Sequence, residues 1–351
     1  MTTRLFAGSA RWTAEDGTQR PGGLFRREAG NGGWQRLGGG LPADVEIRAI
    51  AIHPDDHDVV YAGTQEGPYL STDGGDHWKA LPFPDRRAVW SFLFRPGNPS
   101  VMYAGTAPAA VYRSDDGGRS WRAAKAFATP GRVKMSFPCR VTRLAADPNR
   151  PDEMYAGLEV DGVLRSTDGG ESWEDCSKEL VRLADRPHLK SRIVSDTEIE
   201  GMMDTHALCV SSAAPGRVFL AVRMGVFQSA DRGTSWEDME VGRFSPLTYA
   251  RDVQVWPHDP RTLFACLSPA ARSEDGSLYR SDDLGGSWRR VDHGVKPNST
   301  MMSVALHPKD PNQVYCSTRF GQVFGTRDGG RSWEEHPLPA GTSDVYTIAC
   351  G

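Results

Sequence analysis

The sequence has no hydrophobic run long enough to cross a membrane, and its first residues lack the apolar stretch of a signal peptide. Its net charge of -4 does not suggest a basic surface of the kind that binds nucleic acid. The six cysteines are scattered, with no Cys-x-x-Cys pair, which favours free thiols over a disulfide framework. These absences predict a cytoplasmic protein whose partners include neither nucleic acid nor a membrane.

Turn-forming residues and tryptophan are what the chain has in quantity, with 38 Gly, 24 Pro and 10 Trp among 351 residues. One octet with the pattern Ser/Thr-x-Asp-x-Gly-x-Ser-Trp recurs, and Ser166 to Trp173 is its clearest copy. Six copies begin at Ser71 (with His77 in place of the second Ser), Ser114, Ser166, Ser229, Ser281 and Thr326. A degenerate seventh copy ends at Trp34. Such periodicity predicts a repeat architecture.

Each octet has the chemistry of a tight turn. An Asp carboxylate accepts hydrogen bonds from backbone N–H groups two or three residues further on, and Gly supplies the positive φ where the chain reverses. The Trp then begins a strand and packs between layers. The octet aspartates are therefore predicted to shape the fold rather than to catalyse a reaction.

The six regular octets resemble the Asp-box repeat, also called the BNR repeat, over essentially the whole chain. That repeat occurs in sialidases, in xyloglucan-cleaving glycosidases, in sortilin-type receptors and in a photosystem II assembly factor. The resemblance implies a β-propeller, but it does not imply any one activity.

Each repeat reads as four strands separated by turn signals, which is one propeller blade. Residues 4–8 match a second strand, and the missing first strand is found at 344–350. The predicted fold is therefore all-β, a single seven-bladed propeller of four-stranded antiparallel blades over 1–351. Its first blade would combine residues 3–40 with 343–351, so that the C-terminal strand closes the ring.

Three insertions, at about 124–139, 176–204 and 268–277, interrupt the repeats. In an antiparallel blade, alternate connections lie at opposite ends, so all three insertions are expected on the face opposite the octets. Long loops on a rigid scaffold are where function is usually found. This face is the predicted functional face, and the insertion at 176–204 is the predicted lid of a site.

Alignment of the first strands predicts a ring of side chains where the central channel opens on that face. Its members are Tyr346, Arg48, Trp90, Thr142, His206, Arg251 and Met302. Two interpretations stay open: a solvated channel mouth, or a pocket for a small polar or anionic ligand. For the pocket, the predicted substrate-binding residues are Arg48, Arg251, Arg143, Trp90, Arg223 and Arg319, with Arg140 as a further anion clamp.

The predicted catalytic residues are His206, Asp204, Asp252 and Tyr346. His206 would be a general acid or base oriented by Asp204 or Asp252. His206 is also the predicted ligand of a divalent metal at the channel mouth. The loops between second and third strands carry further carboxylates at Glu66, Glu159 and Asp161. Acidic residues are common in loops, so these are predicted first as ordinary loop residues, and the alternative is that two of them across the mouth act as the acid and base of a glycosidase.

The family resemblance bears on activity in three ways. Sialidases carry an early Phe/Tyr-Arg-Ile-Pro segment, which this sequence lacks, since residues 46–49 are its nearest match and have no Pro. Sialidases are also usually six-bladed. Xyloglucan-cleaving members pair two propellers around a cleft, whereas one propeller is predicted here. Two functions remain open: a hydrolase or lyase acting on a small polar or anionic substrate, and a non-catalytic scaffold that binds a protein partner.

Overall fold

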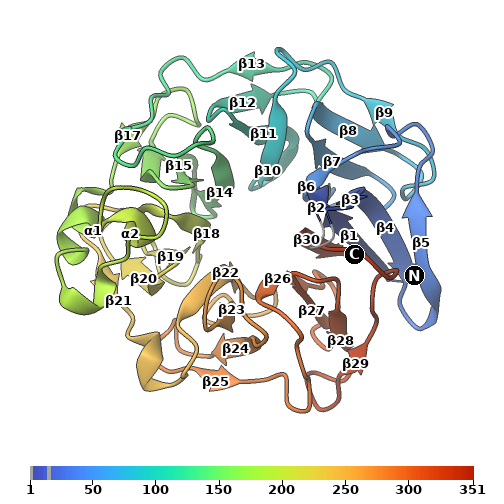
Figure 1. The fold of residues 1–351 in the computed structure, drawn as a ribbon. Helices are drawn as coiled ribbons and strands as arrows, with labels where there is room; N and C mark the ends of the chain where they lie inside the picture. Colours follow the sequence, from blue (N-terminus) through green and yellow to red (C-terminus); the bar gives the residue numbers. More distant parts are fainter. Residues whose placement is uncertain (1–2, 14–16) are drawn as a thin grey trace.

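A computed structural model describes residues 3–13 and 17–351, which form seven four-stranded antiparallel sheets around a central axis (Figure 1). The predicted fold, an all-β seven-bladed propeller, is confirmed. In order from the axis outward, the strands of the blades are β30 (Val345–Cys350), β1 (Arg4–Ser9), β4 (Gly23–Glu28) and β5 (Asn31–Leu37); β6 (Ile47–Ile52), β7 (Val60–Thr64), β8 (Gly67–Ser71) and β9 (Lys79–Ala80); β10 (Ala88–Arg95), β11 (Asn98–Ala107), β12 (Val111–Ser114) and β13 (Arg122–Ala123); β14 (Val141–Asp147), β15 (Arg150–Leu158), β16 (Gly162–Ser166) and β17 (Glu174–Asp175); β18 (Thr205–Val210), β19 (Val218–Val222), β20 (Gly225–Ser229) and β21 (Glu237–Asp238); β22 (Tyr249–Val255), β23 (Leu263–Ser268), β24 (Ser277–Ser281) and β25 (Arg289–Arg290); β26 (Met301–Leu306), β27 (Val314–Thr318), β28 (Val323–Thr326) and β29 (Glu334–Glu335).

The ring closes where the last strand of the chain joins the first blade. β30 pairs antiparallel with β1, with Leu5 opposite Cys350 and Ala7 opposite Ile348. Val345, Ile348 and Cys350 are buried in a cluster shared with the neighbouring blade. The predicted closure is confirmed, and it leaves the inner side of β1 paired rather than open as a sheet edge.

A recurring glycine in the second strand lets neighbouring blades approach closely. A Cβ atom on Gly105 would lie 2.5 Å from Val141 Cγ1, and one on Gly157 would lie 2.5 Å from Thr205 Cγ2, both on the first strand of the next blade. Any larger side chain would force the two sheets apart. The Tyr-Ala-Gly sequence of these strands thus reflects the packing of one blade on the next.

The octets form tight turns in which one carboxylate ties the chain together. Asp168 accepts hydrogen bonds from Ser166 Oγ at 2.8 Å, from Ser172 N at 2.9 Å and from Ser172 Oγ at 2.6 Å. The Trp173 indole donates to Gly170 O at 3.0 Å and is buried. The turn residues therefore act in the fold, as the sequence predicts.

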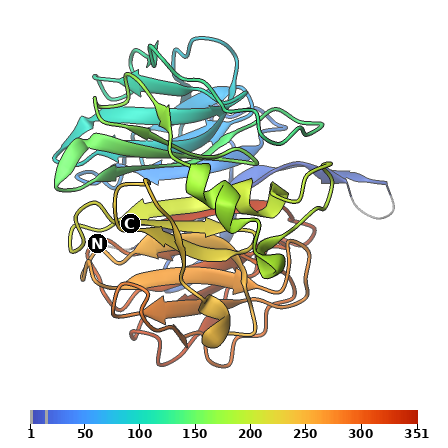
Figure 2. The same cartoon turned by 90° about the vertical axis from the view of Figure 1, so that its left-hand side faces the viewer.

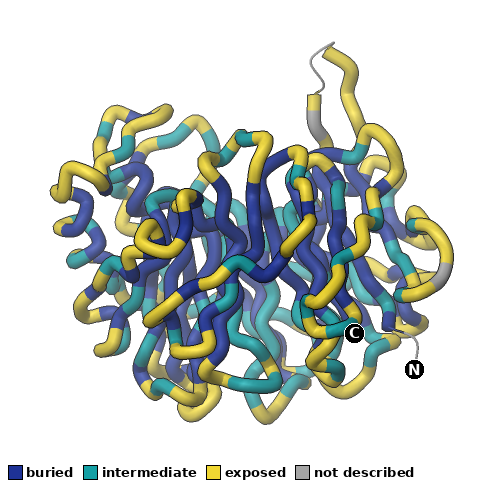
Figure 3. The backbone as a smooth tube through the Cα atoms, turned by 90° about the horizontal axis from the view of Figure 1, so that it is seen from below, coloured by how far each residue is buried: buried dark blue, intermediate teal, exposed yellow. Residues whose placement is uncertain are grey.

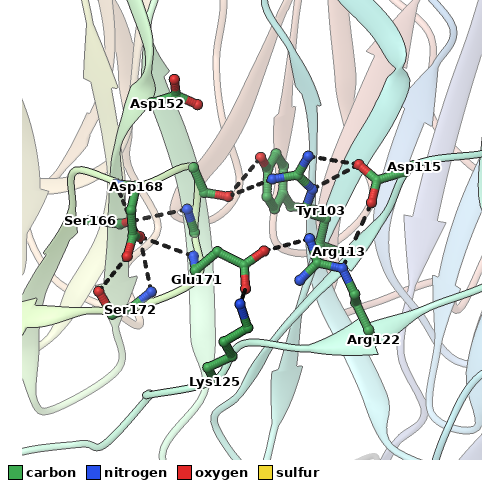
Figure 4. A network of polar contacts seen from close by, with 12 residues as sticks. Tyr103, Arg113, Asp115, Arg122, Lys125, Asp152, Ser166, Asp168, Glu171 and Ser172 are labelled. Atoms are coloured by element: carbon green, nitrogen blue, oxygen red, sulfur yellow. Dashed lines mark hydrogen bonds and ion pairs between the residues drawn. The ribbon is translucent and has the colours of Figure 1, made fainter.

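One octet also connects two blades, as Figure 4 shows. Tyr103 in β11 donates its hydroxyl to Gly169 O at 2.9 Å, and Glu171 pairs with Arg122 of β13 and with Lys125 at 3.2 Å. Because these contacts run between consecutive blades, the turn contributes to blade-to-blade stability as well as to its own hairpin.

Asp168→Ala is expected to lower the free energy of unfolding by about 1 kcal/mol, because backbone and hydroxyl donors lose their acceptor in a turn exposed to water. Thermal unfolding followed by circular dichroism would show this as a decrease of about 1–2 °C in Tm, because the unfolding entropy of a domain of this length is large. The exposed Asp185, replaced by Ala, is the matched control and should unfold at the wild-type temperature. Equal Tm values for both variants would contradict the assigned role.

The octet carboxylates also predict a loss of stability in acid. Partial burial raises the pKa of Asp168, Asp231 and Asp283, but hydrogen bonds from the turns outweigh it and hold all three pKa values below 3.8. A folded-state pKa below the unfolded one gives stability that is present above about pH 4 and is lost as pH falls through the folded value. Chemical denaturation at pH 7, 4 and 3 should show the unfolding free energy fall between the last two.

The first blade departs from the octet pattern. Glu28 pairs with Asn31 across a two-residue turn, so β4 and β5 form a tight hairpin where the other blades have the longer octet turn. The Trp34 indole donates to His336 O at 2.8 Å and thus bonds to the preceding blade. The degenerate copy in the first blade therefore keeps the tryptophan position but lacks the acidic turn.

The sequence predicts the insertion at 176–204 but not its helices, and it predicts neither the short helix after β21 nor the hairpin after β1. The segment between β17 and β18 forms α1 (Lys178–Leu183), η1 (Pro187–Leu189) and α2 (Glu200–Met203), and another short helix, η2 (Val241–Arg243), follows β21. A hairpin of β2 (Trp12–Thr13) and β3 (Gln19–Arg20) follows β1. Figure 2 shows the α1–α2 segment and this hairpin projecting toward the same side of the ring, and Figure 3 shows exposed backbone concentrated in the loops at both ends.

Candidate functional site

Each innermost strand carries a β-bulge, and each bulge lies at one of the seven residues of the predicted ring. The pairing of β6 with β7 passes from Ile47 to Ala49 and skips Arg48, and the pairing of β22 with β23 passes from Ala250 to Asp252 and skips Arg251. The residues skipped in the other five blades are Tyr346, Trp90, Thr142, His206 and Met302. A bulge redirects the side chain of its unpaired residue.

The seven bulge residues line one cavity of about 370 Å³ along the central axis. The same cavity contacts Arg143 and Glu159, and it extends along the inner strands as far as His53 and His57. The predicted ring is thus assembled around a channel. Of the predicted site residues, Arg48, Trp90, Arg143, His206, Arg251 and Tyr346 line it.

Aromatic rings and guanidinium groups alternate across the channel mouth in what we call the mouth stack, formed by Phe137, Arg140, Trp90, Arg48 and Tyr346. Arg140 Cζ lies 4.5 Å from the Phe137 ring centroid and 4.3 Å from that of Trp90. Arg48 Cζ lies 4.7 Å from the Trp90 centroid and 5.0 Å from that of Tyr346. Because both guanidinium groups contact rings, the stack holds them in fixed planes.

A carboxylate is paired with each arginine of the stack. Arg48 pairs with Glu46, and Arg140 Nη1 lies 2.8 Å from Glu159 Oε2. Burial raises the pKa of Glu159 to about 6, although Arg140, Arg251 and Arg48 act in the opposite direction. Glu159 therefore holds its proton to a higher pH than an ordinary glutamate and can donate it near neutral pH.

His206 is enclosed, and both of its ring nitrogens are directed at protein atoms. Nδ1 lies 2.7 Å from Ala250 O, which can only accept, so Nδ1 carries hydrogen. Nε2 lies 3.2 Å from Asp204 Oδ2 and 3.4 Å from the Tyr249 hydroxyl. Burial lowers the pKa of His206, although Asp204 acts in the opposite direction. Burial raises the pKa of Asp204, but its charged neighbours outweigh this effect and lower that pKa.

This geometry corrects the predicted roles of His206 and Asp204. A general base or metal ligand needs a lone pair directed at the cavity, and neither ring nitrogen offers one. Asp204 is 6% exposed and also binds Arg223 Nη2 at 2.7 Å. Within residues 3–13 and 17–351, no three His, Cys, Asp or Glu side chains are grouped to hold a metal ion. The pair is a buried support of the channel wall.

Asp252 and Arg143 form an ion pair below the mouth that spans a whole blade. Arg143 Nη2 in β14 lies 2.8 Å from Asp252 Oδ1 in β22. The other oxygen of Asp252 accepts from Val304 N at 3.1 Å and from Gln254 Nε2 at 2.9 Å. Asp252 thus binds Gln254 of its own blade, Val304 of the following blade and the guanidinium of Arg143. These contacts do not favour the predicted alternative in which Asp252 orients His206.

The remaining predicted arginines lie in three different settings. Arg251 lines the channel, whereas Arg223 lines a second cavity of about 600 Å³ beside it. Arg319 lines neither of these two cavities, because its Nε donates to Asp344 at 2.7 Å and its Nη1 to Ala271 O at 3.3 Å. Its predicted substrate-binding role therefore finds no support in this geometry.

The helical insertion does not cover the channel as the predicted lid would. Its residues Leu189 and Ile193 line the second cavity instead, opposite Met224 and Val241. Glu200 anchors it, because one carboxylate oxygen accepts from the backbone N–H groups of residues 193, 194 and 195 and from the Ser195 hydroxyl. The insertion is thus a fixed wall of the neighbouring cavity.

Several residues of the site were not predicted from the sequence. Phe137 and Glu46 lie in connecting segments that the alignment of the repeats does not cover. Their position at the mouth therefore could not be predicted from that alignment. Tyr249 lies two residues before Arg251 in the same strand, but the bulge at Arg251 interrupts the alternation of side chains, so spacing did not place the Tyr249 hydroxyl beside His206. No helix of the described chain is long and apolar enough to cross a membrane.

Comparisons with known proteins show relatives of two kinds, and no protein-family model matches the chain. A xyloglucanase of Hypocrea jecorina is 24% identical over 337 residues, covering 85% of this chain and 39% of its own length. The chain thus spans about two fifths of the length of the curated relatives it matches first. A second curated relative is a photosystem II assembly lipoprotein, Ycf48, of Synechococcus, 25% identical over 260 residues.

The solved structures that resemble the chain include the same two kinds, xyloglucanases and Ycf48 proteins. The GH74 xyloglucanase of Xanthomonas campestris superimposes with a TM-score of 0.63 at 20% identity, covering 87% of this chain and 46% of that one. A YCF48 structure bound to D1 peptide gives a TM-score of 0.57 at 16% identity, covering 88% and 86%. At these identities the structural likeness establishes fold alone. The chain is therefore a seven-bladed β-propeller with xyloglucanases and Ycf48 proteins as its structural neighbours.

Proposed function

We propose that the chain is a hydrolase that cleaves a glycosidic bond at the channel mouth. The observation that carries the proposal is Glu159, a carboxyl group that lines the channel and whose pKa is about 6. A proton donor of this kind protonates the leaving oxygen of a glycoside. The xyloglucanases among the sequence relatives support a glycoside hydrolase over a lyase.

We assign the second carboxylate that this chemistry needs to Glu46, the partner of Arg48 in the mouth stack. Glu46 is 15% exposed and pairs with Arg48, which stacks on the Trp90 ring, whereas Glu159 pairs with Arg140, which also contacts that ring. In the proposed reaction, Glu159 gives its proton to the departing oxygen as the anomeric carbon–oxygen bond breaks. Water adds to the anomeric carbon, and its proton passes to Glu46. Tyr346 and Trp90 then shape the pocket, consistent with their predicted places at the site.

The test is hydrolysis of a panel of soluble oligosaccharides, including xyloglucan oligosaccharides, with release of reducing ends as the measurement. Purified wild-type protein should release reducing ends from at least one member, and Glu159→Gln should not. A panel that is intact after incubation with wild-type protein would overturn the proposal. Location in the cytoplasm, and the lack of nucleic-acid and membrane partners, remain predictions from the sequence.

Binding of a protein segment is a second candidate function, favoured by one observation. The structure of YCF48 with D1 peptide matches this chain over most of both lengths, whereas the xyloglucanases match over less than half of theirs. Ile193 and Val194 are 54% and 71% exposed beside the second cavity, which suits an apolar side chain of a partner. Loss of peptide-array binding in Ile193→Lys, with hydrolysis absent, would favour this function.

A further inference from the structure

The channel mouth has more guanidinium groups than carboxylates to pair with them. Four arginines in or beside the channel each have a carboxylate within ion-pair distance: Arg48 with Glu46, Arg140 with Glu159, Arg143 with Asp252 and Arg223 with Asp204. Arg251 is the fifth. Across residues 3–13 and 17–351, no carboxylate lies within 4 Å of its guanidinium nitrogens.

The position of Arg251 directs this unpaired charge into the cavity. It is the bulge residue of β22, skipped between Ala250 and Asp252, and it lines the channel with Glu159, Trp90 and Tyr346. The Tyr249 hydroxyl is its hydrogen-bonding neighbour, and Asp204 and Glu159 act on it from beyond ion-pair distance. A half-buried guanidinium without a counter-ion is unfavourable unless an anion from outside completes the pair.

We propose that Arg251 binds the carboxylate of an acidic sugar, so that the substrate of the proposed hydrolase is an anionic saccharide rather than a neutral one. A guanidinium group offers two parallel N–H donors that match a planar carboxylate. The identification as a substrate rests on the proposed function, whereas the binding itself does not.

Binding of such an anion would also act on the proton donor. Arg251 is one of the charges that lower the pKa of Glu159. A bound carboxylate would neutralise that charge and leave burial as the dominant influence on Glu159. The substrate would thereby keep Glu159 protonated, which links recognition at Arg251 to the proposed proton transfer.

Isothermal titration with D-glucuronate, D-glucose and inorganic phosphate tests the assignment directly, with no turnover required. D-Glucuronate should bind wild-type protein more tightly than D-glucose or phosphate, and raising the salt concentration should weaken it. Arg251→Gln should weaken glucuronate binding by about tenfold or more, because a charge-assisted hydrogen-bonded pair is lost. The exposed Arg289, replaced by Gln, is the matched control and should bind as wild type does.

Thermal unfolding separates a binding role from a structural one. Removal of an unpaired half-buried charge should leave Tm unchanged or raise it, whereas a structural arginine would lower it. Equal binding of glucose and glucuronate, unaltered binding by Arg251→Gln, or tighter binding of phosphate would each overturn the assignment. If glucuronate binds through Arg251 while no glycoside is hydrolysed, the proposed function fails and the anion site stands.

Discussion

Replacing Glu159 by Gln is expected to lower the rate of glycoside hydrolysis by about 10²–10⁴-fold, the usual contribution of a positioned general acid. The amide keeps the size of the side chain and a hydrogen-bond acceptor for Arg140, but it has no proton to give to the leaving oxygen. The steady-state kcat/KM on a substrate hydrolysed by the wild type is the measurement. Glu237→Gln changes an exposed glutamate on an outer strand and serves as the matched control.

The pH dependence of the wild type gives an independent check. Since Glu159 must be protonated to act, kcat/KM should fall as pH rises through about 6, and this limb should be missing from the residual activity of the variant. The same raised pKa has a consequence for stability. A folded-state value above the ordinary 4.5 gives a contribution that is present below pH 4.5 and is lost as pH rises through about 6.

Two outcomes would contradict the role of Glu159. One is a variant with wild-type kcat/KM. The other is a variant that loses activity together with its Tm, because the Arg140 pair would then be needed for folding rather than for chemistry. Circular dichroism on the same preparations distinguishes loss of function from loss of structure.

Deletion of residues 343–351 is expected to have the largest effect on stability. It removes β30 and with it the burial of Val345, Ile348 and Cys350, each worth about 2 kcal/mol as apolar surface. It also leaves β1 as an open sheet edge facing the channel. A decrease in Tm of about 10 °C or more is expected, together with aggregation on heating.

A synthetic peptide of residues 343–351, added in excess, provides the control for this deletion. Because β30 is bound only by strand pairing and packing, the peptide should bind the truncated ring and recover part of the lost Tm. Scattering on heating should fall in parallel. An undiminished Tm without residues 343–351 would show that the ring is held closed by the other contacts of its first and last blades.

The arrangement of the ring was predictable because the repeats supply their own alignment. Tyr346, Arg48, Trp90, Thr142, His206, Arg251 and Met302 occupy equivalent positions, and equivalent positions of a closed propeller lie at equal depth around one axis. The bulge at each of these positions was not predictable, because an extra residue in one strand is visible only against its partner strand. It is the bulge that directs each side chain into the channel.

The insertions show where local patterns fail. Helix α1 has six residues and α2 has four, lengths at which isolated helices are marginal in water. Leu180, Met202 and Met203 are buried in a cluster with strands of two blades, so tertiary packing rather than propensity stabilises these turns of helix. The sequence alone does not show the surface on which these helices pack.

The sequence by itself determined the seven-bladed ring, its closure by strand exchange and the residues that face the channel, because spacing along a repeated chain is local information. Membership in the Asp-box group stays a prediction. Only the tertiary structure decided which charges neutralise one another. Asp252 binds Arg143 from two blades away, and Asp204 and Ala250 enclose His206. Among residues 3–13 and 17–351, no carboxylate lies within ion-pair distance of Arg251. Ion pairing depends on distances between blades, which no spacing in the sequence records.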